Sequence, residues 1–227
     1  MDLREEVLVA NLALPANGLV ALTWGNASGI DRSSGLVAIK PSGVPYEQLT
    51  AEEIVIVDLE GEVVEGRRRP STDTPTHLVL YQAFDEIGGV VHVHSPWATA
   101  WAQAQREIPV LGTTHADLSP HPIALTRPLT DEEIALGYES ATGVALVEAV
   151  AARGPLQQPA ALARGHAPFS WGSDPAAAVD HAVTLEQVAH IAHLTLMLNP
   201  DAVVLADAVR DKHFERKHGP GAYYGQC

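Results

Sequence analysis

Two histidines, His92 and His94, stand one residue apart in an apolar, β-branched run, GGVVHVHS. Side chains at positions i and i+2 of a strand point to the same face of a sheet, so both imidazoles are expected side by side. A lone buried histidine is more often a hydrogen-bonded core residue, whereas two on one strand favour a metal site. A metal site and a pair of core histidines are therefore both open until a third ligand is found.

His166, in the segment RGHAPFSWG, is the candidate third ligand. It lies between an apolar segment and a loop of small residues, where its side chain can reach the end of a neighbouring strand. Three imidazoles with one open position are typical of a catalytic zinc-type site, and no cysteines are available to complete a closed structural one. The pattern therefore predicts a metal that acts as a Lewis acid.

Composition limits the classes of partner. The chain has 227 residues, is 46% hydrophobic and carries a formal net charge of −14, which is typical of a globular protein and argues against a nucleic acid or an anionic membrane as its main partner. The acidic amino terminus lacks the features of a signal peptide, and no uncharged apolar run of roughly 18 residues occurs. With a single cysteine, Cys227, a reduced cytoplasmic location is expected.

The elements that must position these histidines alternate between helix and strand. Helices are expected from Asp2, from residues 73–74, from Pro96, from Thr130 and from Asp174, although glycines at 137 and 143 make one unbroken helix after Thr130 doubtful. Strands are expected at 19–24, 35–39 and 88–95, with a hairpin over 54–66, a loop over 112–123 and a strand leading to a loop over 161–172. This order predicts an α/β domain with a mixed sheet, and the absence of a GxGxxG motif after the first strand disfavours a Rossmann fold.

Six segments together resemble the class II aldolase/epimerase family, and specifically its phosphopentulose epimerases: LTWGNAS, IKPSGV, PSTDTPTHLVLYQAF, GGVVHVHS, GTTHAD and DKHFERKHGPGAYYGQ. They follow one another with appropriate spacing from about residue 5 to residue 226. The resemblance implies one three-layer α/β/α domain over residues 1–227, with a central mixed, largely antiparallel sheet. It also implies that a tail of about residues 208–227 contributes to the active site.

The resemblance implies two sets of binding residues. The metal would be held by Asp73, His92, His94 and His166, with zinc favoured and manganese or cobalt able to use the same ligands. The substrate phosphate would be bound by main-chain amides and polar side chains, with Lys40 as a further positive group. The phosphate-site residues are Gly25, Asn26, Ser42, Gly43, Ser71 and Thr72.

The implied reaction is a metal-dependent interconversion of L-ribulose 5-phosphate and D-xylulose 5-phosphate in arabinose catabolism, by breaking and re-forming the C3–C4 bond. The family assigns proton transfer to residues that match Asp117 and Tyr224, and a tail histidine that matches His213 either assists or lies on the surface. In relatives these groups come from a neighbouring subunit, so a homotetramer with sites at its interfaces is expected. A small pentulose phosphate is the expected partner, with no nucleic acid and no membrane.

Two other functions stay open. A class II sugar-phosphate aldolase would release the two fragments, but such aldolases carry a glutamate where Asp73 stands. A non-catalytic domain like the adducin head lacks the metal site, so the three histidines argue against it. One departure from the family is Ala167, which follows His166 where a glycine is usual and could displace the loop.

Three further patterns favour ordinary structural roles. Glu186, His190 and His193 share one helical face, which more often packs than binds a metal. Trp97 and Trp101 are expected in the core or at a subunit contact, and the arginines of GRRRP (66–70) in a solvated loop.

Overall fold

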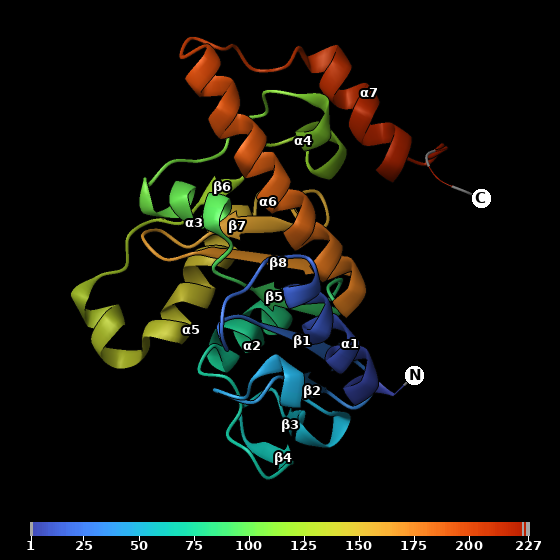
Figure 1. Ribbon diagram of the computed structural model, residues 1–227, viewed down its shortest axis with the longest axis vertical. Helices are drawn as coiled ribbons and strands as arrows, with labels where there is room; N and C mark the ends of the chain where they lie inside the picture. Colours follow the sequence, from blue (N-terminus) through green and yellow to red (C-terminus); the bar gives the residue numbers. More distant parts are fainter. Residues whose placement is uncertain (1, 224, 226–227) are drawn as a thin grey trace.

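Eight strands form a single sheet through the middle of the protein (Figure 1). The computed structural model describes residues 2–223 and 225. Along the sheet the order is β4-β3-β2-β1-β5-β8-β7-β6, and only the pair β6 and β7 is parallel. The strands are β1 (Asn26–Asp31), β2 (Leu36–Ile39), β3 (Val55–Val57), β4 (Val63–Glu65), β5 (Gly89–His92), β6 (Ala124–Leu125), β7 (Ala160–Leu162) and β8 (Pro168–Gly172). The predicted mixed, largely antiparallel sheet is thus confirmed.

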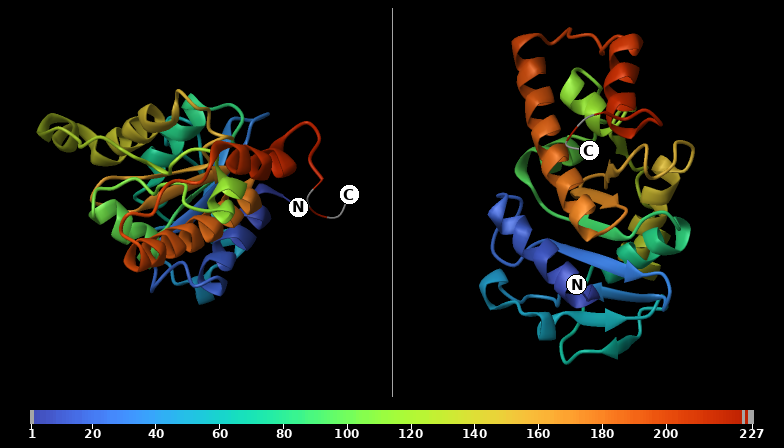
Figure 2. Two further views of the ribbon diagram at one scale, coloured as in Figure 1. Left: turned by 90° about the horizontal axis from the view of Figure 1, so that it is seen from above. Right: turned by 90° about the vertical axis from the view of Figure 1, so that its right-hand side faces the viewer.

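Helices cover both faces of this sheet and make three layers (Figure 2). The helices are α1 (Leu3–Ala16), α2 (Thr74–Ala83), α3 (Pro96–Gln103), α4 (Thr113–Leu118), α5 (Asp131–Val150), α6 (Pro175–Leu198) and α7 (Asp207–His218), with short 3-10 turns at Tyr46–Gln48 and Ala51–Glu53. On one face α2 and α5 bury residues such as Leu80 and Leu146, and on the other α1 and α6 bury Leu14 and Ala178. No helix in the part of the chain that is described is both long and apolar enough to cross a membrane.

Three of the predicted helix starts are confirmed by their side-chain caps, whereas neither Asp73 nor Thr74 caps α2 as predicted. The side chains of Asp2, Thr130 and Asp174 each accept a hydrogen bond from a main-chain amide three residues later, and the first two complete capping boxes. The expected interruption of the helix after Thr130 occurs at Gly137, where φ is 167° and ψ is 85°. Gly143 stays helical, and a Cβ there would lie 2.7 Å from Val79, so this glycine allows α5 to approach α2 closely.

Three local predictions were wrong. Residues 19–24 form turns instead of a strand: Leu22 has a φ of 55°, and pairing with the sheet begins only at Asn26. The expected loop over 112–123 contains α4, which is stabilised by burying Ala116 and Leu118. The expected strand and loop over 161–172 are the end of β7, a turn and a second strand, β8. Each of these three structures depends on contacts with segments that are distant in the sequence.

Candidate metal centre and active site

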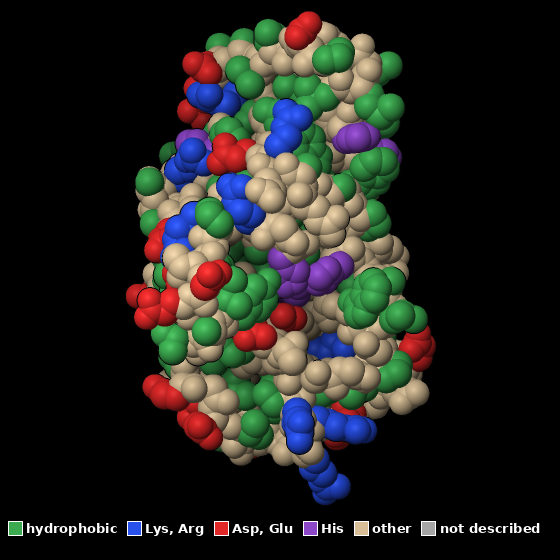
Figure 3. Space-filling view, turned by 90° about the vertical axis from the view of Figure 1, so that its left-hand side faces the viewer, with side chains coloured by type: hydrophobic (Ala, Val, Ile, Leu, Met, Phe, Trp, Pro, Cys, Tyr) green, Lys and Arg blue, Asp and Glu red, His purple; other side chains and the backbone are tan. Residues whose placement is uncertain are grey.

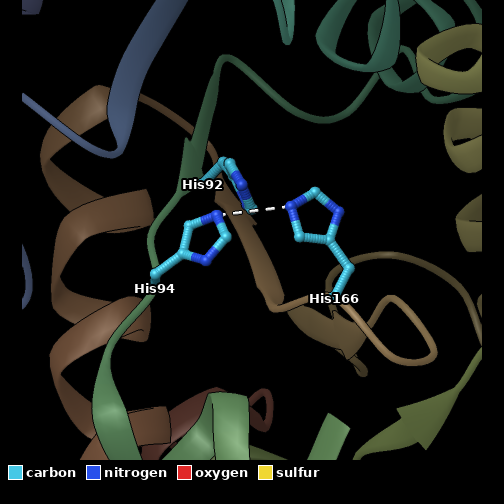
Figure 4. Close-up of side chains that lie close together, drawn as sticks. All are labelled: His92, His94 and His166. Carbon is cyan, nitrogen blue, oxygen red and sulfur yellow. Dashed lines mark hydrogen bonds between the residues drawn. The ribbon is translucent and has the colours of Figure 1, made fainter. Parts of the chain in front are cut away.

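The sheet order brings the three predicted histidines together at the ends of neighbouring strands. His92 ends β5, the central strand between β1 and β8, and His94 follows two residues later on the same side. His166 lies in the turn between β7 and β8, and β8 pairs with β5 in the sheet. Gly165 has a φ of +70° and allows this turn, so the three rings face a common space (Figure 4). Ala167 is buried without a positive φ, so the glycine usual at that position is not needed here.

The spacing of the ring nitrogens fits a metal ion. One nitrogen from each histidine lies within 4.8 Å of the other two, and His94 Nε2 is 3.3 Å from His166 Nε2. The three ring centroids are 4.9 Å apart in every pair. Three imidazole nitrogens that converge in this way are a common donor set for zinc and similar divalent cations. The residues present therefore fit a divalent metal.

Neighbouring groups fix the orientation of two of the rings. His92 Nδ1 donates to the Pro168 carbonyl at 3.0 Å, and its ring stacks on Phe169 with centroids 4.1 Å apart. His166 Nδ1 lies 3.1 Å from the Tyr138 hydroxyl. A hydrogen bond at Nδ1 leaves Nε2 free to act as a metal ligand. Both rings are thus held with Nε2 toward the common space.

Burial keeps these histidines uncharged near neutral pH. It lowers the pKa of His92 to about 3, and it lowers the pKa values of His94 and His166 below the ordinary value as well. The neighbouring imidazoles of the cluster add to this effect at His166 and His92, because protonation of one ring opposes that of the next. Since a metal binds only neutral imidazole, the site is prepared to receive a cation.

Asp73 lies beside this centre without joining the histidine cluster. It occupies the N-cap position of α2, but its Oδ2 accepts from Asn26 Nδ2 at 2.7 Å instead of capping the helix. Burial opposes its ionisation, yet the hydrogen bond from Asn26 helps to hold its pKa below the usual range. Among the described residues, the ligand atoms that converge within 4.8 Å belong to the histidines alone.

A cavity of about 510 Å³ opens directly onto the histidines. Its lining includes the four predicted metal ligands, all six predicted phosphate-site residues and Lys40. Figure 3 shows this face, where histidine side chains gather beside a hollow. The cavity therefore unites residues from five separate sequence segments: 23–26, 40–43, 71–73, 92–94 and the position of His166.

The polar lining of this cavity suits an anion. Lys40 is 2% exposed, with its Nζ 4.8 Å from the centre of the Tyr46 ring, and burial lowers its pKa. Gly25 and Gly43 have φ values of +80° and +69°. A Cβ at Gly25 would lie 2.8 Å from Val20 and 3.0 Å from the His92 carbonyl, so only glycine fits between the loop and β5.

Asp117 lies in a different polar cluster, on α4 against α7, at the end of the protein opposite β4 (Figure 1). Its carboxylate contacts Arg216 Nη2 at 2.7 Å, His213 Nδ1 at 3.0 Å and Lys217 Nζ at 3.6 Å. Burial opposes ionisation, but these partners lower the pKa of Asp117 below its usual range. The described residues that line the histidine cavity do not include Asp117, and Tyr224 lies outside the described residues.

The expected structural roles of the other polar patterns agree with the contacts observed. Glu186 accepts from the main-chain amides of Trp97 and Ala98, both at 2.9 Å, so it caps the start of α3. His190 stacks on Trp97 with centroids 4.0 Å apart, and Trp101 is buried. In the run at 66–70, Arg68 forms an exposed ion pair with Glu53.

Two residues of the centre were missed by sequence reasoning. Phe169 supports His92, and Tyr138 contacts His166 from another element. The short distance of Phe169 from His166 in the sequence is a usable signal, because both belong to one hairpin. Tyr138 precedes His166 by 28 residues and follows a helix break, so no local pattern indicates the contact.

The chain is similar to known proteins over nearly its whole length. The sequence model of the class II aldolase and adducin N-terminal domain matches residues 5–193. The chain is 51% identical over 224 residues to L-ribulose-5-phosphate 4-epimerase UlaF of Salmonella paratyphi A (strain ATCC 9150 / SARB42), covering 99% of this chain and 98% of that protein. A solved structure of L-fuculose 1-phosphate aldolase is 26% identical, with a TM-score of 0.81 and 95% of both chains covered. An l-fuculose-1-phosphate aldolase from Thermus thermophilus is 25% identical, with a TM-score of 0.65, covering 89% of this chain and 98% of that one.

Proposed function

The chain belongs to the class II aldolase and adducin N-terminal domain family, and we propose that it is an epimerase that interconverts L-ribulose 5-phosphate and D-xylulose 5-phosphate. The observation that carries the proposal is the cavity in which the three histidines meet the anion-binding loops. One end of this cavity suits a metal-bound carbonyl compound, and the other suits a phosphate. A pentulose phosphate has both groups in one molecule.

The family depends on a divalent metal, and we assign zinc to His92, His94 and His166. When bound, the cation supplies Lewis-acid polarisation of the substrate's carbonyl group. We also assign Asp73, which lines the same cavity and accepts a hydrogen bond from Asn26, as the fourth protein ligand. Manganese and cobalt accept the same donors and are the alternatives.

The phosphate is assigned to the loops on the other side of the cavity. Main-chain amides at Gly25 and Gly43, with the hydroxyls of Ser42, Ser71 and Thr72, form short bonds to phosphate oxygens. Lys40 adds positive charge in a chain whose net charge is −14. Such a binding site orients the sugar with its carbonyl end toward the histidines.

The reaction follows from the position of the inverted carbon. C4 of a ketopentose is not adjacent to the C2 carbonyl, so removing its hydrogen gives no stabilised carbanion. Instead, a base removes the proton of the C4 hydroxyl, the C3–C4 bond breaks and its electron pair stays on the three-carbon fragment as an enediolate. Glycolaldehyde phosphate rotates within the cavity, the bond re-forms on its other face, and the C4 oxygen regains a proton.

We assign the proton transfers to Asp117 and Tyr224, supplied by a neighbouring subunit of a homotetramer. This assignment explains why Asp117 is held as a carboxylate by α7 and yet lies outside the histidine cavity of its own chain. The region between α6 and α7 also exposes apolar side chains, with Leu198 89% and Val203 83% exposed. Contact with another subunit would cover such residues, and residues 208–227 would then complete the active site.

A class II sugar-phosphate aldolase is the second candidate, favoured by the structural similarity to L-fuculose 1-phosphate aldolase. Asp73, one methylene shorter than the glutamate of such aldolases, and the 51% identity to an epimerase over 99% of the chain support epimerisation instead. The histidine centre disfavours a non-catalytic role like that of an adducin head. The cytoplasmic location and the place in arabinose catabolism stay predictions.

The test is to incubate the zinc-loaded protein with L-ribulose 5-phosphate and measure D-xylulose 5-phosphate and free glycolaldehyde phosphate in the same sample. We expect D-xylulose 5-phosphate without accumulating aldehyde, and none after removal of the metal by a chelator. Accumulating aldehyde would assign the chain to the aldolases. Absence of turnover with bound metal would refute the proposed substrate.

A further inference from the structure

Tyr138 stands where α5 is interrupted, beside the metal centre. The backbone at Gly137 leaves the helical region, and the helix resumes with Tyr138. The Tyr138 hydroxyl lies 3.1 Å from His166 Nδ1, and the two ring centroids are 6.0 Å apart. Because 28 positions of sequence separate the two residues, the contact depends on the fold.

The part of α5 after the break is anchored firmly enough to hold a side chain in place. Thr142 Oγ1 donates to the Tyr138 carbonyl at 2.8 Å, and Thr76 Oγ1 of α2 donates to the Glu139 carbonyl at 2.7 Å. Gly143 lets this part of α5 approach α2 closely. By contrast, Ile134 and Leu136, before the break, are 50% and 81% exposed. The break therefore separates an exposed segment from one fixed against α2.

We propose that Tyr138 is a positioning residue for the metal centre: its hydroxyl oxygen accepts the Nδ1 proton of His166 and so directs the His166 Nε2 lone pair toward His94 and the metal. The Pro168 carbonyl does the same for His92. The inference rests on the proposed metal centre but not on the identity of the substrate. It gives α5, which contributes none of the predicted metal ligands, a role in the site.

The two orienting contacts differ in kind. Pro168 acts through a main-chain oxygen that belongs to β8, next to β5 in the sheet, so its position is set by strand pairing. Tyr138 acts through a side-chain hydroxyl from a helix. A phenolic hydroxyl can accept a hydrogen bond while keeping its own proton. Only the contact of His166 can be removed by a single side-chain substitution.

The test is Tyr138→Phe in the full chain, with cobalt(II) as the metal probe and no substrate. The substitution removes one oxygen at a residue that is 38% exposed, so the fold should be retained. Loss of such an orienting contact weakens metal binding by about 10- to 100-fold, measured by competition with a chelator. The visible absorption of bound cobalt, which reports ligand geometry, should change as well. Leu136→Ala, on the exposed segment of the same helix, is the matched control and should bind cobalt as the wild type does.

The outcomes separate this proposal from the proposed function. Equal cobalt affinity and an unchanged cobalt spectrum in Tyr138→Phe and wild type would refute the role of Tyr138. A wild-type chain that takes up no cobalt would refute it together with the metal centre. Weakened binding in Tyr138→Phe alone would support it even if the wild type failed to epimerise L-ribulose 5-phosphate, since that failure concerns only the substrate.

Discussion

The two polar clusters of this protein are built in opposite ways. The histidine cluster forms where β5 meets the β7–β8 turn, and burial keeps its rings uncharged. The Asp117 cluster joins α4 to α7, and Asp117 and Arg216 are 99 positions apart in the sequence. Ionic contacts stabilise this cluster, because one carboxylate accepts hydrogen bonds from Arg216 and His213. The first cluster lines a large cavity, whereas the second lies outside it.

This difference supports the proposal that each active site takes residues from two subunits. Neutral donors that converge on one point are suited to a cation, and the chain supplies them without help. A carboxylate kept ionised by several cationic neighbours is available to accept a proton, but among the described residues it does not line the cavity of its own chain. We infer that one chain carries a complete metal centre and supplies the proton-transfer residues for its neighbour's site.

The largest effect is expected from His94→Asn. Removing one of three imidazoles should abolish stoichiometric metal binding, and the loss of several kcal/mol of electrostatic stabilisation lowers turnover by about 10³-fold or more. Metal content by elemental analysis and turnover of L-ribulose 5-phosphate check this together. A variant that lacks metal and keeps full turnover would refute the mechanism.

Asp117→Asn should show that the two clusters act independently, one in metal binding and the other in proton transfer. This substitution keeps the shape of the side chain but removes the base, so turnover should fall by about 10²- to 10⁴-fold while metal content stays at the wild-type level. The measurement is again metal content and turnover on one preparation. Loss of metal together with activity would contradict the independence of the two clusters, and an unchanged rate would remove Asp117 from proton transfer.

Mixing the two inactive variants tests the proposed exchange between subunits. In re-assembled tetramers, a site is intact when an Asp117→Asn subunit supplies the histidines and a His94→Asn neighbour supplies Asp117. Random assembly gives about one quarter of wild-type activity. No recovery after verified subunit exchange would place both clusters of a working site in the same chain.

The comparison also explains what the sequence could predict. The HxH strand, the capping residues Asp2 and Asp174 and the hairpin over 54–66 are local patterns, and the structure confirms them. Residue type alone suggested that His166 lies close to His92. Only the order of the strands in the sheet establishes this contact. Residues 19–24 were misassigned because their apolar alternation lacks a strand to pair with, and Tyr138 has no local signal.

Acid should destabilise the fold through buried neutral histidines before it discharges Asp117. Burial lowers the pKa values of His77 and His115 to about 4 each, below the unfolded value of about 6.5. The unfolded chain therefore binds more protons between these values, and the stability present above pH 6.5 is lost as the pH falls toward 4. Between pH 7 and pH 5 each histidine should cost about 2 kcal/mol of unfolding free energy. Urea unfolding of wild type and His115→Gln at both pH values checks this, and equal pH dependence would contradict it.

The smallest effect is expected from substitutions around Asp117, where charged partners share one carboxylate. Arg216 binds both carboxylate oxygens, with Nε 3.2 Å from Oδ1 and Nη2 2.7 Å from Oδ2, whereas Lys217 Nζ lies 3.6 Å from Oδ2. A bidentate contact fixes the plane of the carboxylate as well as its charge, so Arg216→Gln should lower kcat by about 10-fold and raise the pKa of Asp117. Lys217→Gln, the matched loss of one charge that lies 3.6 Å from the carboxylate, should change kcat by less than about threefold. The kcat of both variants measured against pH decides the matter, because equal effects would mean that charge alone, and not the orientation of the carboxylate, governs proton transfer.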